Sequence, residues 1–264
     1  MKARSSSPLP FSSRVRRRVQ SIFGRRQPKF HNFGAEYDDD LRATYRGASA
    51  DIFFANDGPI IHKWLHYFAI YDQVLASYVG SSVKMLEIGV SKGGSLGLWR
   101  KFLGSDAVIF GVDVDLNCSR HDGEFASVRI GSQDDARFLR TVVAEMGGID
   151  VVLDDGSHIA RHQRASFDVL FPLLNEGGIY IIEDMHTSYW PPFEGGLNKS
   201  GTAIEFLKGK IDEMHAHYRV EGLNKAECMP DIESIQFFDS IAVVKKRKQL
   251  PRFHMQVPSP NVSP

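Results

Sequence analysis

The chain has 264 residues, with 32 Lys and Arg, 32 Asp and Glu, 42% hydrophobic residues and two Cys. This length is enough for one large domain, or two small ones, with a substantial core. Two Cys exclude a disulfide-stapled secreted scaffold and a Cys-rich zinc module. No run approaches the roughly 18 consecutive apolar residues that a transmembrane helix needs.

The balanced charge is distributed unevenly along the chain. Residues 1–33 contain nine Lys and Arg and no acid, and residues 245–264 contain five and no acid. Without those fourteen, the segment 34–244 holds 18 basic and 32 acidic residues, a net charge of −14. The sequence therefore describes an acidic body between two basic tails, and no basic groove for nucleic acid is expected at an active site.

The N-terminal residues 1–33 are rich in Ser, Pro and Arg and lack the apolar core of about 7–15 residues that a secretory signal requires. We interpret them as a basic disordered arm. Two alternatives stay open, which are weak contact with an anionic membrane or partner, and an organelle transit peptide. Cys118 and Cys228 have no metal-ligand spacing, so we expect free thiols in a reducing compartment, the cytoplasm.

The segment 34–82 is expected to be an N-terminal helical part that packs on the rest or faces the substrate. Residues 56–59 (NDGP) are typical of a helix start, and apolar residues then recur at helical spacing through 59–79. These are Ile61, Trp64, Leu65, Phe68, Tyr71, Leu75, Tyr78 and Val79. We interpret this aromatic stripe as core, with a substrate-contacting lid as the alternative.

From residue 83 onward, short apolar runs alternate with helical segments. Strands are predicted at 83–90, 107–114, 127–130, 150–153 and 178–182, and helices at 95–102, 134–146, 160–174 and 202–218. Such alternation indicates a parallel sheet covered on both faces. Two further runs, 232–238 and 241–246, predict an antiparallel hairpin at or near the sheet edge.

These elements predict an α/β fold with a Rossmann-like, doubly wound, mostly parallel sheet of seven strands and a terminal antiparallel hairpin. One domain accounts for residues 83–246, and a basic, Pro-containing tail follows at 247–264. In such a sheet, ligands bind beyond the carboxyl ends of the strands. Those positions are where candidate functional residues are to be sought.

The loop after the first predicted strand, residues 87–95 (EIGVSKGGS), is rich in glycine. Glycines there allow a tight turn and close approach to a ligand at a helix N-terminus. The spacing does not fit a phosphate-binding loop that ends in GK[ST]. The loop also differs from G-x-G-x-x-G, because Ser91 stands at the position of the second Gly, which a pyrophosphate needs. Asp113 ends the second strand, where an acid can accept hydrogen bonds from both ribose hydroxyls. A ribose without a pyrophosphate points to S-adenosylmethionine (SAM).

Acidic residues follow the fourth and fifth predicted strands, in residues 154–158 (DDGSH) and 183–186 (EDMH). Neighbouring strands would bring four carboxylates and two imidazoles to one edge, and burying that much like charge is unfavourable unless protons or a cation neutralise it. Carboxylate oxygens without thiolates favour Mg²⁺ or a similar divalent ion. His158 follows past a glycine turn and could point at a substrate oxygen beside the metal. The alternative is a set of ordinary acids at strand ends.

Four segments of the chain resemble class I SAM-dependent methyltransferases of the metal-dependent sugar O-methyltransferase group. This group includes macrolide-sugar methyltransferases of the mycinamicin pathway and methylmannose polysaccharide methyltransferases. The matching segments are LEIGVSKGGSLGLW (86–99), GVDVD (111–115), DDGSH (154–158) and IEDMHTSYW (182–190). The resemblance covers residues 83–190, and the last two segments are its most specific part.

The resemblance implies a role for each matching position. Asp155, Glu183 and Asp184 would bind the metal, and His158 would be the general base, with Asp155 also at the catalytic centre. His186 and Tyr189 are substrate-side candidates, although His186 could instead support a metal ligand through a hydrogen bond. Whether Asp154 faces SAM or the metal stays open. The cofactor-binding candidates are Glu87, Gly89, Gly93, Asp113, Ser132, Gln133 and Asp154.

The implied activity is SAM-dependent, Mg²⁺-assisted methylation of a hydroxyl on a sugar, glycan or glycosylated natural product. The resemblance also implies a homo-oligomer, in which the N-terminal region can close a neighbour's site. Residues 34–60 resemble the group only faintly, so the acceptor is not predicted. The alternatives are a nicotinamide-dependent or hydroxylase-like enzyme on the same sheet, and a non-catalytic SAM-binding or interaction protein.

Overall fold

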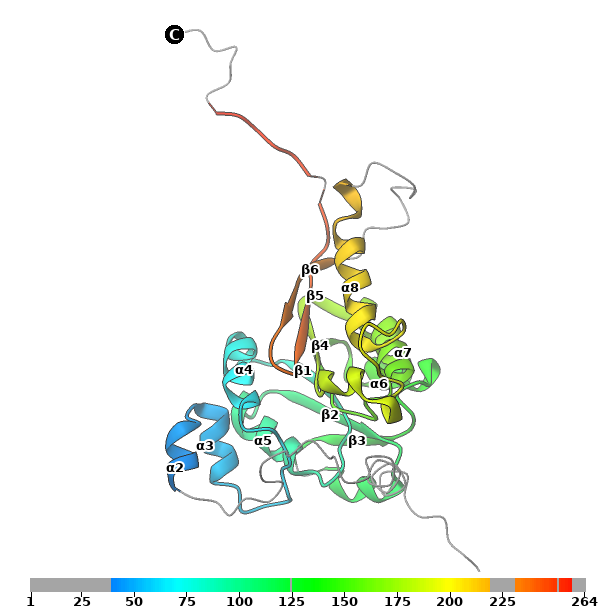
Figure 1. The fold of residues 1–264 in the computed structure, drawn as a ribbon. Helices are drawn as coiled ribbons and strands as arrows, with labels where there is room; N and C mark the ends of the chain where they lie inside the picture. Colours follow the sequence, from blue (N-terminus) through cyan, green and yellow to red (C-terminus); the bar gives the residue numbers. More distant parts are fainter. Residues whose placement is uncertain (1–38, 124, 219–230, 251, 258–264) are drawn as a thin grey trace, which may run out of the picture.

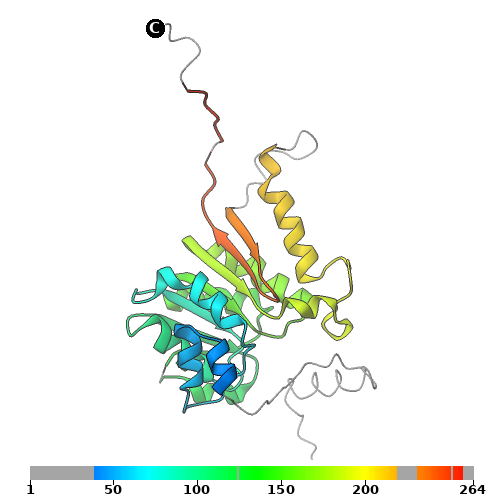
Figure 2. The same ribbon diagram turned by 60° about the vertical axis from the view of Figure 1, so that its left-hand side comes forward.

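The computed structural model describes residues 39–123, 125–218, 231–250 and 252–257. The predicted basic arm at 1–33 and Cys228 lie outside these ranges. Within them, no helix combines the length and the apolar character that crossing a membrane requires. Residues 252–257, from the predicted basic tail, run away from the folded body (Figures 1 and 2).

A single seven-stranded sheet organises the described residues, with the strand order β3-β2-β1-β4-β5-β7-β6. Neighbours among β1 to β5 pair in parallel, and β7 pairs antiparallel with β5 and β6. The predicted fold class and edge hairpin are therefore confirmed. The strands are β1 Lys84–Ile88, β2 Val108–Asp113, β3 Ser127–Ile130, β4 Ile149–Asp154, β5 Leu174–Ile182, β6 Ile232–Phe237 and β7 Ala242–Lys246.

Helices cover both faces of the sheet, with α3, α4 and α5 on one side and α6, α7 and α8 on the other (Figure 1). The helices are α2 Asp39–Thr44, α3 Ala48–Phe54, α4 Tyr67–Val74, α5 Gly94–Leu103, α6 Ala136–Met146, α7 Ala160–Leu170 and α8 Ala203–Met214. Short 3-10 turns complete the connections. They are η1 Ala76–Tyr78, η2 Leu116–His121, η3 Phe171–Leu173, η4 Met185–Tyr189, η5 Pro191–Phe193 and η6 Ala216–Tyr218.

The apolar runs of the central strands follow from this double covering. On β1, Met85 belongs to the core beneath α4 and α5, whereas Leu86 belongs to the core beneath α6 and α7. Both side chains are fully buried. Burying an apolar side chain of this size contributes about 1.5–3 kcal/mol, and a strand covered on both faces makes that contribution with side chains of either face. The sheet edge that carries the polar loops is thereby fixed by two hydrophobic layers.

The helix predicted over 59–79 is wrong in its first half. Helix α4 begins at Tyr67, and residues 55–66 are non-helical. This stretch instead lies against the carboxyl edge of the sheet, where Lys63 forms buried ion pairs with Asp155 and Glu183. The second half of the stripe is core as predicted, since Phe68 and Leu75 are buried. Helix α3 (Figure 2) was not predicted, and it packs against α4 and α5.

The strand register sets the two acidic loops side by side. Asp154 pairs with Ile182 across β4 and β5, so the next residues, Asp155 and Glu183, leave the sheet at the same level. The glycine loop after β1 packs onto the same place. Gly89 has φ of +99°, and a Cβ there would lie 2.1 Å from the backbone oxygen of Asp155. Only glycine fits both the conformation and the close approach.

We predict opposite effects for two glycine-to-alanine substitutions. Gly89→Ala should lower the free energy of unfolding by at least about 2 kcal/mol, because it combines a strained φ with an overpacked contact. Gly209→Ala in α8, where a Cβ meets nothing within 4 Å, should raise it by about 0.5–1 kcal/mol. Urea unfolding monitored by circular dichroism measures both. A Gly89→Ala protein as stable as wild type would contradict this account of the loop.

Candidate active site at the carboxyl ends of the strands

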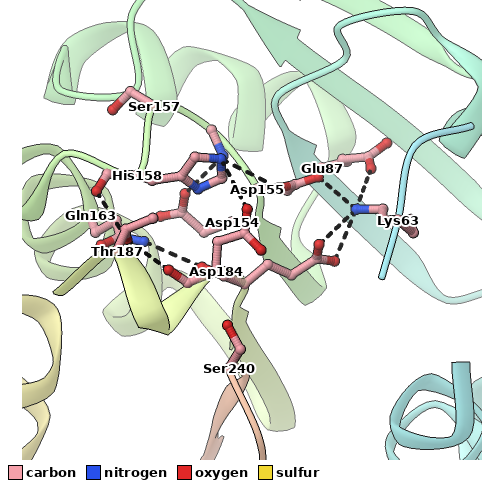
Figure 3. Close-up of polar contacts among 12 residues, drawn as sticks. Lys63, Glu87, Asp154, Asp155, Ser157, His158, Gln163, Asp184, Thr187 and Ser240 are labelled. Atoms are coloured by element: carbon pink, nitrogen blue, oxygen red, sulfur yellow. Dashed lines mark hydrogen bonds and ion pairs between the residues drawn. The ribbon is translucent and has the colours of Figure 1, made fainter. Parts of the chain in front are cut away.

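The loops after β4 and β5 bring most of the predicted metal and catalytic residues together. Asp155 and His158 come from the loop after β4, and Glu183 and Asp184 come directly after β5. Figure 3 shows the side chains of Asp155, His158 and Asp184 converging over the sheet edge. The predicted juxtaposition therefore exists in the structure.

Three of these residues lie close enough together that they could hold a metal ion. Asp155, His158 and Asp184 each offer a ligand atom, and the three atoms lie within 4.8 Å of one another. Nε2 of His158 lies 3.7 Å from Oδ1 of Asp155 and 3.5 Å from Oδ2 of Asp184. Two carboxylates and an imidazole form a donor set that fits a divalent cation. Glu183 is not part of this group of three.

Backbone strain accompanies the convergence. His158 and Asp184 have φ of 56° and 55°, in the left-handed region that residues other than glycine rarely adopt. Such conformations persist only where the surroundings hold them, and here Tyr67 and Thr187 do so. The Tyr67 hydroxyl donates to Oδ1 of Asp184 at 2.8 Å, and the Thr187 hydroxyl donates to the Asp184 carbonyl at 2.7 Å. These contacts aim the Asp184 side chain at the cluster, and the Thr187 hydroxyl also contacts the His158 carbonyl at 3.5 Å.

Lys63, which belongs to no recognisable sequence motif, is the lysine that pairs with the cluster among the described residues. Its Nζ lies 2.6 Å from Oδ2 of Asp155, and 2.8 and 3.0 Å from the two carboxylate oxygens of Glu183. Glu87 is 4.0 Å away. Lys63 and His158 approach the acidic side chains from opposite sides (Figure 3). Burial by itself would lower the pKa of Lys63, but Asp155, Glu183 and Glu87 raise it overall, so the ammonium stays charged.

Two tyrosines of α4 complete the support of the acids after β5. The Tyr71 hydroxyl donates to Oε1 of Glu183 at 2.6 Å, and Tyr67 donates to Asp184. Tyr71 belongs to the predicted core stripe, whereas Tyr67, four residues earlier on the same face of α4, is not part of it, so the sequence pattern did not indicate that both hydroxyls reach the acids. For Asp184, burial would raise the pKa, but His158, His186 and the other partners lower it overall.

Asp154 lies apart from the metal-capable group. Its buried carboxylate accepts hydrogen bonds from Ser166 Oγ at 2.6 Å, Tyr180 OH at 2.9 Å and Gln133 Nε2 at 3.2 Å. Burial raises its pKa. The side-chain oxygen of Gln133 in turn accepts from the backbone of Ser157 at 2.7 Å. Asp154 and Gln133 therefore tie the loop that carries His158 to the interior of the domain.

The other cofactor candidates stand at the ends of the neighbouring strands β1, β2 and β3. Oδ2 and Oδ1 of Asp113 accept from the backbone of Ser91 and Asp115, each at 2.9 Å, which fixes the carboxylate beside the glycine loop. Glu87 is fully buried and accepts from Ser95 Oγ at 2.9 Å. Gly93 caps α5 with φ of 79°. Ser132 donates to Asp134.

His186 and Tyr189 lie at the rim of the site. Nδ1 of His186 contacts the hydroxyl of Ser240, at the tip of the β6–β7 hairpin. The His186 ring lies 4.6 Å from that of Trp190 and 5.8 Å from that of Trp64. Burial lowers the pKa of His186. Tyr189 is half exposed. Ser240 was also not selected from the sequence, since nothing in a turn dipeptide indicates that the hairpin reaches the acidic loops.

Curated relatives resemble this chain over 62–70% of its length. A rhamnosyl tetracenomycin-C 2'-O-methyltransferase of Streptomyces olivaceus is 36% identical over 197 residues, which is 70% of this chain and 52% of the relative. The L-olivosyl-oleandolide 3-O-methyltransferase of Streptomyces antibioticus is 39% identical over 179 residues, covering 62% and 46%. The chain thus spans about half the length of the curated relatives it matches. No protein-family model matches the chain.

Solved structures agree with these relatives. MycE methyltransferase of the mycinamycin pathway, in complex with Mg and S-adenosylhomocysteine (SAH), has a TM-score of 0.67 and 32% identity, covering 80% of this chain and 55% of MycE. The complex that also contains mycinamycin VI has a TM-score of 0.65. The fold is therefore that of the Rossmann-like methyltransferases. Within that class, the resemblance to sugar O-methyltransferases of natural-product pathways is confirmed.

Glu87 should make the stability of the metal-free protein depend on pH. Burial raises the pKa of Glu87 from 4.5 to about 7, against the opposing effect of Lys63. A carboxyl that holds its proton more tightly in the folded chain stabilises it fully below about pH 4.5 and loses that stabilisation as the pH rises towards 7. The side chain that Glu87→Gln introduces is neutral at every pH. Over this pH range the free energy of unfolding of the variant should therefore fall by roughly 3 kcal/mol less than that of wild type.

Urea unfolding in EDTA between pH 4.5 and 7.5 measures this difference. Asp212→Asn, which changes an exposed acid of α8, is the control and should follow the wild-type curve. Parallel curves for wild type and Glu87→Gln would show that the folded environment does not perturb the Glu87 carboxyl.

Proposed function

We propose that this protein is a SAM-dependent, metal-assisted O-methyltransferase that acts on a sugar hydroxyl of a glycosylated natural product. The observation that carries the proposal is the convergence of Nε2 of His158 with the carboxylates of Asp155 and Asp184, next to a glycine-rich loop. This arrangement offers a base, a site for a divalent cation and a place for a nucleoside at one sheet edge.

The proposed metal ligands are Asp155, Asp184 and Glu183. The convergence of Asp155 and Asp184 supports the first two, and Nε2 of His158 beside them is assigned to proton transfer and not to the metal. Glu183 is adjacent, but its oxygens contact Lys63 and Tyr71, so it would join the metal through an oxygen that it shares with those partners. Asp155 contacts Lys63 through Oδ2 and faces His158 with Oδ1. That division leaves Oδ1 directed towards the proposed metal position.

The proposed cofactor site comprises Glu87, Gly89, Gly93, Asp113 and Ser132. The fixed Asp113 carboxylate beside the loop supports a contact with a ribose. Gln133 and Asp154 act in this proposal by holding the loop of residues 156–158, rather than by meeting the ligand through their side chains.

The bound groups supply the chemistry that side chains lack, because SAM carries an activated methyl group and a divalent cation lowers the pKa of a hydroxyl that it contacts. The contribution of the chain is to orient the acceptor and to accept the proton of its hydroxyl. His158, held in a strained backbone conformation, presents Nε2 to the opening between Asp155 and Asp184. There it would take the proton of the acceptor hydroxyl, and the methyl group would pass from a bound SAM to that oxygen with S-adenosylhomocysteine as the leaving group.

The acceptor class comes from the relatives. Their names describe methylation of a rhamnosyl tetracenomycin, an olivosyl oleandolide and mycinamicin VI. The rim residues Trp64, His186 and Trp190 place aromatic surface beside the acids, and such surface suits a sugar ring. We therefore propose a glycosylated small molecule as the acceptor.

Calorimetric titration and labelled methyl transfer test this function together. SAM should bind and NAD should not, and methyl-labelled SAM should label at least one of a panel of glycosylated macrolides and aromatic polyketides. Transfer should stop in EDTA and return with excess Mg²⁺. Binding of NAD in preference to SAM would favour an oxidoreductase, and absence of SAM binding with Mg²⁺ present would favour a non-catalytic protein.

His158→Ala should lower kcat by about 10²- to 10⁴-fold, because it removes the group that accepts the proton. SAM affinity should stay within about twofold of wild type, since the cofactor candidates lie on other loops. His215→Ala, at the end of α8, is the matched control and should retain full activity. A large loss of SAM affinity in His158→Ala would place this side chain in the cofactor site instead.

A further inference from the structure

We infer that Lys63 is a built-in counter-cation for the acidic cluster. In the metal-free protein it offsets part of the negative charge of Asp155 and Glu183, and it competes with a bound divalent metal for these two carboxylates. The inference extends the proposed function by naming a positioning residue outside the predicted motifs. The competition rests on the proposed metal site, whereas the neutralising role does not.

The geometry of the ammonium group carries the first part of the inference. Nζ of Lys63 lies within 3.0 Å of three carboxylate oxygens, one from Asp155 and two from Glu183. Its side chain is only 3% exposed, and that of Glu183 only 1%. An ammonium has three N–H donors, and these contacts use its hydrogen-bonding capacity. Lys63 therefore has no donor left for a substrate, so its role is to hold the acids in place.

The origin of Lys63 in the chain makes this contact long-range. It belongs to the non-helical residues 55–66, and its partners Asp155 and Glu183 lie 92 and 120 positions further along. The neighbouring helix α4 sends Tyr71 to the same Glu183 carboxylate. The N-terminal segment thus closes one side of the acidic cluster with a cation and a phenol. His158 occupies the opposite side (Figure 3).

The competition follows from the shared oxygens. A divalent ion near Asp155 and Asp184 would lie beside the ammonium that already holds Asp155 and Glu183, and like charges at such short range repel strongly in a buried site. Lys63 should therefore stabilise the site without metal and limit how much further stabilisation the metal brings. Removing Lys63 should do the reverse, leaving buried carboxylates that only a bound metal or uptake of protons can neutralise.

Lys63→Met tests the inference. Its thermal unfolding is compared with that of wild type in EDTA and in a saturating concentration of Mg²⁺ or Mn²⁺, about 10 mM. In EDTA its Tm should be lower than wild type by roughly 5–15 °C, because an unpaired buried charge is costly. Metal should raise its Tm by several degrees more than it raises that of wild type. Lys101→Met, an exposed position of α5, is the control and should match wild type in both conditions.

A second variant separates charge from shape. If uncompensated charge destabilises Lys63→Met, then Lys63→Met combined with Glu183→Gln should recover a large part of the lost Tm in EDTA. No recovery, or a Lys63→Met protein as stable as wild type without metal, overturns the neutralising role. A metal response equal in wild type and Lys63→Met overturns the competition. SAM binding by the same proteins then shows whether the proposed enzyme function stands independently.

Discussion

Repulsion among the carboxylates that follow β4 and β5 is the constraint on which the site depends. Asp155, Glu183 and Asp184 leave the sheet side by side because the strand register places them there. Lys63 pairs with Asp155 and Glu183 on one side, and His158 faces Asp155 and Asp184 on the other. Like charges are tolerated in a buried site only when such partners are present. The fold must therefore place positively charged groups beside these acids.

The N-terminal part of the domain is consequently a component of the site and not only a cover for the sheet. Helix α4 buries apolar side chains such as Phe68 and Leu75, while its Tyr67 and Tyr71 hydroxyls reach the acids after β5. Packing energy thus fixes the direction of polar groups that would otherwise be free to rotate. Buried contacts also fix the loop behind the site, where Asp154 holds Gln133 and Gln133 holds the backbone of the loop that carries His158.

The sheet was predictable because burial on both faces imposes continuous apolar runs, and the acids after β4 and β5 were predictable because parallel strands end at one edge. Lys63 was not, since a single lysine in a helix-like pattern carries no mark of its distant partners. Asp154 shows a different limit. Sequence placed it next to Asp155, but alternation along β4 turns its side chain towards Ser166 and Tyr180 instead.

The central claim is that this acidic edge binds a divalent metal beside the SAM loop. A crystal structure with Mn²⁺ and S-adenosylhomocysteine, phased to show the anomalous signal of manganese, tests it most directly. The account predicts one strong anomalous peak at bonding distance from Asp155 and Asp184, with the nucleoside ribose at Asp113. A peak elsewhere, or an empty site with Lys63 still occupying the cluster at saturating Mn²⁺, would contradict it.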